Sequence, residues 1–145
     1  MRPAADLERA LARMTFRVEP GRFCLVGFAG APVPGDLAHL AAGPGQLVVE
    51  AEGTTLLVRA EELDVLLARR PDARVERDLR WIRFDVPMSW EVVGFLATLT
   101  ARLAAAGIPL GCVCGFDRDH LFLPERYLDR AERILGELFA AGGGR

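Results

Sequence analysis

The order of strand-like and helix-like segments in the second half of the chain limits its fold more than any other feature. Apolar and polar side chains alternate at 79–86, as in a strand with one buried face. At 90–106 apolar side chains recur every three or four positions, as in a helix. Two short strands and a second helix follow. The expected segments are a strand at 79–86, a helix at 90–106, strands at 108–114 and 120–123, and a helix from Pro124.

Single residues mark the expected ends of the central helix of this half. Ser89 is a suitable N-cap, because its hydroxyl can accept a hydrogen bond from a free backbone N–H of the first turn. Gly107 is a natural left-handed stop. Gly94 falls inside the predicted helix, where glycine costs about 0.5–1 kcal/mol relative to alanine. A close approach of the helix to a sheet would explain that glycine.

The first half of the chain repeats this order loosely, with a much shorter first helix. Its expected segments are an amphipathic helix at 4–14, strands at 15–18, 22–28, 47–51 and 54–59, a helical turn near 36–41, a helix at 61–69 and a brief strand at 74–77. Units of this kind form an antiparallel sheet with helices on one face. The predicted fold class is therefore α+β, with two ferredoxin-like half-domains of the βαββαβ type.

The predicted boundaries of the half-domains are 1–76 and 77–145. By this division the second half is one strand short. We expect the segment at 15–18, which precedes the first half's own strands, to supply the missing strand of the second half. This exchange would hold the two halves together.

Composition and charge argue against several classes of protein. Eighteen basic and 20 acidic side chains give a formal net charge of −2, and no segment is rich in Lys or Arg. We expect no nucleic-acid partner, because phosphate neutralisation dominates such binding. The longest weakly charged run, 92–101, is far shorter than the roughly 20 residues of a membrane-spanning helix. Residues 1–13 lack the apolar core of a signal peptide, so we expect a soluble, cytoplasmic protein with no membrane partner.

The three cysteines, Cys24, Cys112 and Cys114, cannot all pair within one chain, which agrees with a reducing compartment. Cys112 and Cys114 would face the same side of a strand. No second cysteine pair or histidine cluster completes the four ligands of a metal site. We therefore expect these cysteines to be buried as small apolar residues, and we expect no metal and no cofactor.

Several runs of the chain resemble a bacterial group of tandem ACT-domain proteins of unassigned function. The resemblance extends over about residues 6–138 and is carried by the runs 50–58, 80–84, 89–95, 103–108 and 115–124. The run from Asp119 to Pro124 is also similar to the ACT units of the eukaryotic cytosolic arginine sensor, which carries four such units. The resemblance implies two ACT half-domains, a regulatory and non-catalytic role, and a homodimer that would correspond to one sensor.

The resemblance also implies a ligand site. In the sensor, arginine lies between two ACT units, held by the turn at the start of a helix, an edge strand and an aspartate. Transferred position by position, these elements fall on Ser89 and Gly94, on Ile108 to Leu110, and on Asp119. The implied ligand is an amino acid or a similar small molecule at an ACT–ACT interface. Asp117 and Arg118 depart from the pattern of the bacterial group, and they either pair with each other or change the ligand preference.

The chemistry of these positions agrees with an amino-acid site. A helix N-terminus offers free backbone N–H groups and a partial positive charge to a carboxylate, and Asp119 can accept hydrogen bonds from an ammonium group. The strand at 108–110 can add backbone hydrogen bonds. Each side chain also has a purely structural interpretation, in which Ser89 caps a helix and Asp119 caps a turn.

The remaining polar and aromatic residues have simpler expected roles. His120 is expected to pack as a strand residue, and His39 has no visible partner in the sequence. Trp81 and Trp90 are expected in the core or in an interface. Glu91 is expected to face solvent, because it would repel a ligand carboxylate.

Three classes of function are compatible with these observations. The first is a ligand-binding regulatory module whose regulated protein partner the sequence does not name. The second is a metal-assisted enzyme that uses Asp117, Asp119 and His120, although no activated nucleophile or phosphate-binding glycine loop is present. The third is a structural interaction module. We expect the first class, with no catalytic residue.

Overall fold

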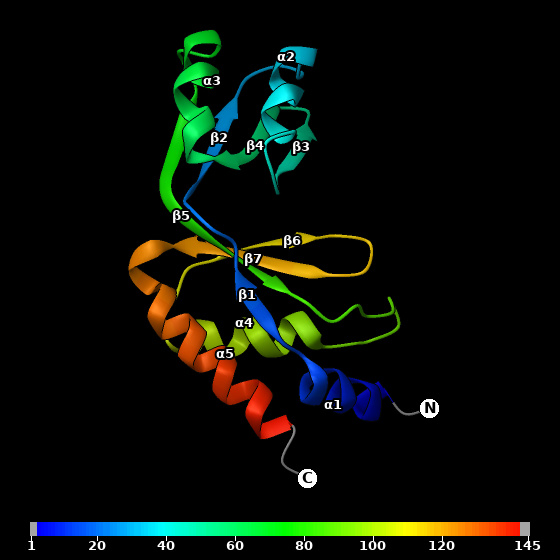
Figure 1. Cartoon of the computed structure of the whole chain (residues 1–145). Helices are drawn as coiled ribbons and strands as arrows, with labels where there is room; N and C mark the ends of the chain where they lie inside the picture. Colours follow the sequence, from blue (N-terminus) through cyan, green and yellow to red (C-terminus); the bar gives the residue numbers. More distant parts are fainter. Residues whose placement is uncertain (1–2, 143–145) are drawn as a thin grey trace. The chain divides into compact units, whose positions relative to one another are not determined.

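The computed structural model describes residues 3–142, which form two compact units (Figure 1). Residues 20–80 form one of them, here called the central unit. Residues 3–19 and 81–142 form the other, here called the terminal unit. The strand β5 (Arg74–Phe84) runs through the boundary between the two, so that each unit contains part of it.

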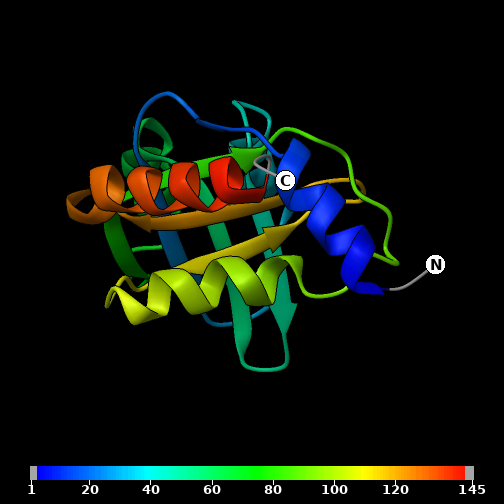
Figure 2. The same ribbon diagram turned by 90° about the horizontal axis from the view of Figure 1, so that it is seen from below.

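The terminal unit contains four strands in the order β1-β5-β7-β6. The register of β1 on β5 is antiparallel, with Phe16 opposite Phe84, and β6 and β7 form an antiparallel hairpin. Its elements are α1 (Pro3–Arg13), β1 (Phe16–Val18), the end of β5, α4 (Phe95–Ala105), β6 (Gly111–Cys114), β7 (Asp119–Pro124), the 3-10 helix η3 (Glu125–Tyr127) and α5 (Leu128–Gly142). The helices α4 and α5 lie side by side on one face of these strands (Figures 1 and 2).

The central unit has the equivalent order β3-β4-β2-β5, with every pair antiparallel. Its elements are β2 (Phe23–Phe28), α2 (Pro34–Leu37), the 3-10 helix η1 (Ala38–Leu40), β3 (Gln46–Glu50), β4 (Gly53–Arg59), the 3-10 helix η2 (Ala60–Glu62), α3 (Leu63–Arg69) and the start of β5. The structure confirms the predicted α+β fold class with antiparallel strands, helices and a ferredoxin-like layout.

The strand β5 is continuous where the sequence predicted two separate strands, 74–77 and 79–86. Its first part pairs with β2, and its last part pairs with β1. The register on β2 shifts between Phe23 and Leu25, and Asp78 has a φ of 55°. The extra residue of this β-bulge interrupts the alternation of side chains, which explains why the pattern indicated a break.

The segment Phe16–Val18 (β1) pairs with β5 in the terminal unit, the position expected for residues 15–18. This strand is followed along the chain by the whole central unit, and the chain then returns to the terminal unit through β5. The predicted boundary between residues 76 and 77 falls within β5.

The predicted start of the second-half helix was wrong, because α4 begins at Phe95 instead of Trp90. Gly94 is the N-cap residue and has a φ of 94°, in the left-handed region that a helix interior does not allow. Ser89 instead closes a tight turn, in which its carbonyl accepts a hydrogen bond from Val92 N–H at 3.1 Å. The apolar residues before Gly94 continue the helical spacing without being helical.

Two further segment boundaries differ from the prediction. The strand β6 begins at Gly111, so Ile108 to Leu110 precede it rather than form its edge. Pro109 lies in this stretch and has no backbone N–H to donate to a sheet. The last helix begins at Leu128, after a 3-10 turn whose N-cap is Pro124.

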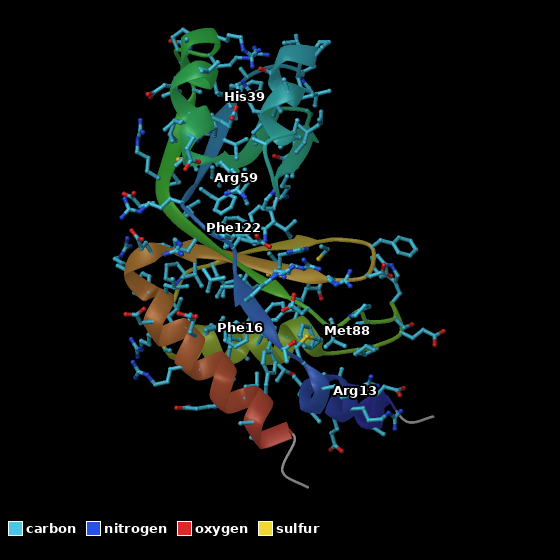
Figure 3. The ribbon with its side chains drawn as sticks, in the orientation of Figure 1. Arg13, Phe16, His39, Arg59, Met88 and Phe122 are labelled. Atoms are coloured by element: carbon cyan, nitrogen blue, oxygen red, sulfur yellow. The ribbon has the colours of Figure 1, made fainter. Side chains whose placement is uncertain are left out.

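The two units have separate hydrophobic cores. In the terminal unit the rings of Phe84, Phe95 and Phe139 pack together, with the first pair 5.4 Å apart and edge to face. Phe16, labelled in Figure 3, adds a tilted contact to Phe139. The central core consists of smaller side chains: Cys24, Val26, Leu56, Val58, Leu63 and Leu66. Within residues 3–142, no helix has the length and apolar character needed to span a membrane.

Candidate functional site

A cavity of about 310 Å³ lies in the terminal unit, where the loop after β5 meets the hairpin of β6 and β7. Three segments form its wall: the turn before α4, the first turn of α4 and the loop between β6 and β7. The lining residues are Met88, Ser89, Trp90, Val92, 94–97 and 114–119. Figure 3 labels Met88 in the first of these segments.

The cavity brings together three of the five residues predicted for a ligand site. Ser89, Gly94 and Asp119 all line it. Ile108 and Leu110 are not part of the lining. Ile108 is buried in the hydrophobic core of the unit, and Leu110 packs against that core.

The N-terminus of α4 forms one wall of the cavity. No side chain caps it, and Phe95 to Ala97 line the cavity directly. Thr98 donates to the Gly94 carbonyl through both its N–H and its hydroxyl, at 2.9 and 2.8 Å. The N–H groups of a first helical turn have no partner within the helix and carry a partial positive charge. This wall is therefore suited to an anion.

The loop between β6 and β7 forms another wall of the same cavity and carries two carboxylates. Asp117 is exposed and Asp119 is half-buried. Arg118 lies between them in the sequence, but its Nε donates to the carbonyl of Asp85 at 3.0 Å. Met88 N–H donates to the Asp117 carbonyl at 2.8 Å and joins the two loops. This wall is suited to a cation.

Cys114 lies opposite Asp119 across the hairpin, and both line the cavity. Partial burial and a hydrogen bond to Asp119 raise the pKa of the Cys114 thiol. The thiol is therefore protonated at neutral pH. Cys112 and Cys114 are both exposed, so the prediction that they are buried was wrong, whereas Cys24 is buried. They lie on β6, which is the last strand in the sheet order of residues 3–142.

Two aromatic side chains stand at the cavity with most of their surface in solvent. Trp90 is 80% exposed and Phe116 is 85% exposed, and both are among the lining residues. Trp90 is therefore not a core residue, unlike Trp81, which is 2% exposed. Trp90 belongs to the tight turn before α4, and Phe116 belongs to the hairpin loop between β6 and β7.

His120 packs within the strands, as predicted from the sequence. Its Nδ1 accepts a hydrogen bond from Trp81 Nε1–H at 3.0 Å, and the two rings meet edge to face at 5.5 Å. Burial, followed by the nearby charge of Arg83, lowers the pKa of His120. His120 does not line the cavity.

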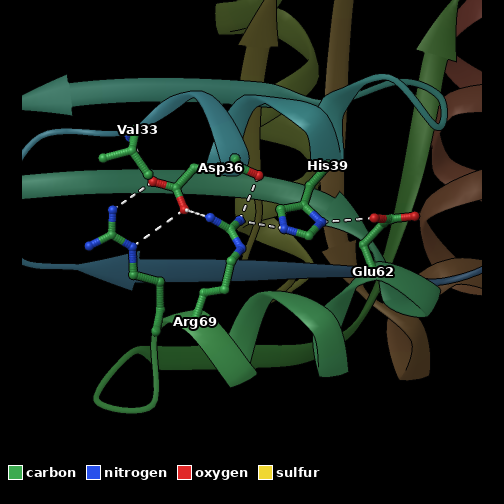
Figure 4. Close-up of polar contacts among 7 residues, drawn as sticks. Val33, Asp36, His39, Glu62 and Arg69 are labelled. Atoms are coloured by element: carbon green, nitrogen blue, oxygen red, sulfur yellow. Dashed lines mark hydrogen bonds and ion pairs between the residues drawn. The ribbon is translucent and has the colours of Figure 1, made fainter.

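A buried polar cluster in the central unit was missed by the sequence analysis, which found no partner for His39. His39 is buried, and its Nδ1 lies 2.8 Å from a carboxylate oxygen of Glu62. Its Nε2 lies 2.7 Å from Arg69, which also contacts Asp36 at 3.0 Å (Figure 4). Arg70 binds Asp36 at 2.6 Å. The partners are 23 to 34 positions apart in the sequence, so no local pattern could have shown them.

Asp36 is at the centre of this cluster and is fully buried. Its carboxylate also accepts a hydrogen bond from Val33 N–H at 2.8 Å, at the start of α2. The hydrogen bond from Arg70 is the main cause that lowers the pKa of Asp36 to about 2. The cluster joins α2 and η1 to α3, and its residues line neither the cavity at the start of α4 nor the one between β3 and β4, so we interpret it as structural.

A second cavity, of about 320 Å³, lies in the central unit at the equivalent hairpin between β3 and β4. Its lining residues are 27–29, Glu50, 52–55, Asp72 and Arg74. No residue of α2 lines it, so this cavity has no helix N-terminus in its wall. Within residues 3–142, no group of three or more His, Cys, Asp or Glu side chains is placed to hold a metal ion.

Residues 74–137 match the family model of the ACT domain. The matched segment runs from the start of β5 into α5 and contains the whole cavity at the start of α4. It covers just under half of the 145 residues. The ACT match and the ferredoxin-like layout of the terminal unit agree, because the matched segment contains β5, β6, β7 and both helices packed on them.

Solved structures extend the likeness to the full length. A Vibrio cholerae protein of unknown function, named as a possible transport protein, is 27% identical, with a TM-score of 0.73 over 96% of this chain and 99% of its own. An Agrobacterium tumefaciens protein has the same TM-score at 17% identity, over 90% of both chains. The ligand-free regulatory subunit of aspartate kinase from Thermus thermophilus has a TM-score of 0.62 at 15% identity, over 86% of this chain and 96% of its own.

These structures show the fold that the chain shares with them. None of the curated protein sequences compared with the chain matches it.

Proposed function

We propose that this chain is a non-catalytic regulatory module that binds an amino acid in the cavity at the start of α4. The observation that carries the proposal is that the uncapped N-terminus of α4 and the Asp119 carboxylate line one cavity of about 310 Å³. This volume is at the lower end of the range for small-molecule pockets. The match to the ACT domain and the shared fold with a regulatory subunit of aspartate kinase support the same function.

The two walls of the cavity suit the two charged groups of an amino acid. The ligand carboxylate accepts hydrogen bonds from the first-turn N–H groups of α4, where the helix dipole favours negative charge. The ammonium group donates to Asp119, and Ser89 contributes the turn that leads into the site. The side chain of the ligand lies against Trp90 and Phe116, which are exposed in the single chain.

We further propose that a homodimer closes the site, so that the ligand lies at an interface between ACT half-domains of two protomers. Exposed Trp90, Val93 and Phe116 support this part, because large apolar side chains around a cavity are typical of surfaces that a partner covers. The resemblance to bacterial tandem ACT proteins supports it as well. The exposed free thiols of Cys112 and Cys114 support a cytoplasmic location.

Calorimetric titration of the purified chain with each of the twenty amino acids tests the proposal. We expect one amino acid, or a small group of similar ones, to bind. Asp119→Asn should weaken that binding at least tenfold, because the ammonium group loses its charged partner. The melting temperature without ligand should change little, since Asp119 is at the rim of a cavity.

The matched control is Asp129→Asn, which removes an exposed carboxylate from the first turn of α5 outside the cavity lining. It should leave the affinity unchanged. Equal affinity in the Asp119 and Asp129 variants would remove Asp119 from the site. No heat with any amino acid would reject the proposed ligand class.

A structural interaction module is the second candidate, and the exposed rings of Trp90 and Phe116 favour it. The two candidates differ in ligand dependence. If Trp90→Ala abolishes self-association, measured by sedimentation, and no amino acid binds to either the dimer or the monomer, the interaction module is the better account.

A further inference from the structure

The contact between Trp81 and His120 defines which ring nitrogen of the histidine carries a proton. Trp81 Nε1–H is a donor only, and it lies 3.0 Å from His120 Nδ1. Nδ1 must therefore be the acceptor, and the single proton of the neutral imidazole is on Nε2. The structure thus fixes the Nε2–H tautomer of His120.

This contact joins two neighbouring strands of the terminal unit. Trp81 belongs to β5 and His120 to β7, which are adjacent in the strand order. Trp81 is almost completely buried, and the two rings pack edge to face with their centroids 5.5 Å apart. Protonation of Nδ1 would place two N–H groups against each other within hydrogen-bond distance.

The charged groups around His120 come from four segments of the terminal unit. Arg83 on β5 and Arg118 in the hairpin loop disfavour a positive charge on the ring, whereas Asp119 on β7 and Glu19 after β1 favour one. Burial, the largest effect, and Arg83, the next largest, both lower the pKa of His120. The surroundings therefore agree with the neutral ring that the hydrogen bond requires.

We propose that the hydrogen bond between Trp81 and His120 is a pH-sensitive clasp, a side-chain contact that adds to the pairing of β7 with β5 while His120 is neutral and is lost when Nδ1 is protonated. Because Asp119 immediately precedes His120 on β7, the clasp also holds one wall of the cavity. Its effect on ligand binding rests on the proposed function, whereas the clasp itself does not.

The direction of the pH dependence follows from the lowered pKa. The unfolded chain takes up a proton on His120 at about pH 6.5, and the folded chain resists it until a lower pH. The contribution of the clasp to stability is therefore complete above about pH 6.5. It is lost as the pH falls from that value through the pKa of the folded state.

Fluorescence of Trp81 tests the clasp without any ligand. The chain has two tryptophans, and Trp90→Phe removes the exposed one, so that all tryptophan emission comes from Trp81. We expect the emission to change between pH 8 and pH 5 with one midpoint below 6.5. His120→Gln should abolish this transition, because the Gln side-chain oxygen accepts from Trp81 without titrating.

The matched control is His39→Gln, since His39 is the only other histidine of the sequence and lies in the central unit. It should leave the Trp81 transition in place. A transition that persists in His120→Gln, or disappears in His39→Gln, would overturn the proposal.

Nitrogen-15 NMR of the unmodified protein gives a second measurement, which holds if a variant fails to fold. We expect the His120 ring to show an Nε2–H proton and an unprotonated Nδ1 at pH 7.5. An Nδ1–H tautomer would overturn the clasp even if an amino acid binds. If the clasp is observed and calorimetry finds no amino-acid binding, only the proposed function fails.

Discussion

The terminal and central units share one strand order, but the connection from β5 to β6 in the terminal unit differs in length from the equivalent connection from β2 to β3 in the central unit. In the terminal unit this connection contains the 11-residue helix α4, and in the central unit it contains the four-residue α2 followed by a 3-10 turn. A long helix can bury a stripe of apolar side chains against the sheet. A single turn cannot, so the central unit fixes its short helix to α3 with Asp36, His39, Arg69 and Arg70. The comparison shows that the helix between two equivalent strands can be held either by apolar packing or by a buried polar cluster.

The difference between the long α4 and the short α2 also distinguishes the two cavities. These lie at equivalent hairpins and have nearly equal volumes of about 310 and 320 Å³. The uncapped N-terminus of α4 lines the cavity of the terminal unit, whereas carboxylates and Arg74 line that of the central unit. A helix N-terminus and a carboxylate line the same cavity in the terminal unit, whereas no helix N-terminus among the described residues lines the second cavity, so the first cavity is the proposed ligand site.

The largest predicted effect tests the packed aromatic rings in the core of the terminal unit. Phe84→Ala should lower the free energy of unfolding by about 3–5 kcal/mol, because it opens a cavity among three packed rings. Urea unfolding measures the loss. Phe116→Ala is the control, and its exposed ring should cost less than about 0.5 kcal/mol. A similar loss in both variants would mean that the ring cluster does not close the terminal unit.

The next largest effect tests the buried polar cluster around Asp36 in the central unit. Asp36→Asn should lower the free energy of unfolding by about 2–3 kcal/mol, because Arg69 and Arg70 lose a buried charged partner but keep some contact with water. Asp64→Asn, at an exposed position on α3, is the control. Hydrogen exchange should show the faster opening in residues 33–40 and 63–70, and an unchanged exchange rate there would contradict the role of the cluster.

Protonation of Asp36 at low pH should lower the free energy of unfolding by less than the Asp36→Asn substitution does. The pKa of Asp36 is lowered from 3.8 to about 2, so its contribution is present above pH 3.8 and lost as the pH falls toward 2. We expect a loss on the order of 1 to 2 kcal/mol over this interval. The difference in stability between the parent and Asp36→Asn, followed by urea unfolding at several pH values, should shrink over the same interval. A constant difference would show that Asp36 is not ionised as proposed.

The smallest effect concerns the start of α4. Gly94→Ala should destabilise the chain by about 1 kcal/mol, because Gly94 has a φ of 94° and a new Cβ would lie 3.2 Å from the Leu7 side chain. Gly136→Ala is a control of opposite sign, since Gly136 is inside α5 with open space around it. That change should stabilise by about 0.5–1 kcal/mol. Thermal unfolding of both variants measures the pair, and equal shifts would remove the special role of Gly94.

The spacing of apolar side chains predicted the strands and helices whose pattern depends on residues close together in the sequence. The pairing of residues 15–18 with the second half also followed from counting strands. Periodicity failed where a single glycine interrupted it, because the apolar residues before Gly94 keep the helical spacing although the helix begins only at Phe95. It failed again at Ile108, where core packing and not strand pairing holds the residue.

The candidate site was predicted in part. Ser89, Gly94 and Asp119 line one cavity, whereas Ile108 and Leu110 lie outside its wall. The exposed rings of Trp90 and Phe116 and the thiol of Cys114 were not placed at the site by the sequence. Their position depends on two loops that come together only when β5, β7 and α4 are assembled.

The sequence by itself determined the order of strands and helices, because alternation and helical spacing arise from contacts within a few residues. It also supplied the charges of the proposed ligand site. Only the tertiary structure decided which partners bury His39 and Asp36, and which nitrogen of His120 is protonated. These contacts join residues 23 to 39 positions apart, and the distance and direction between such groups exist only once the chain has folded.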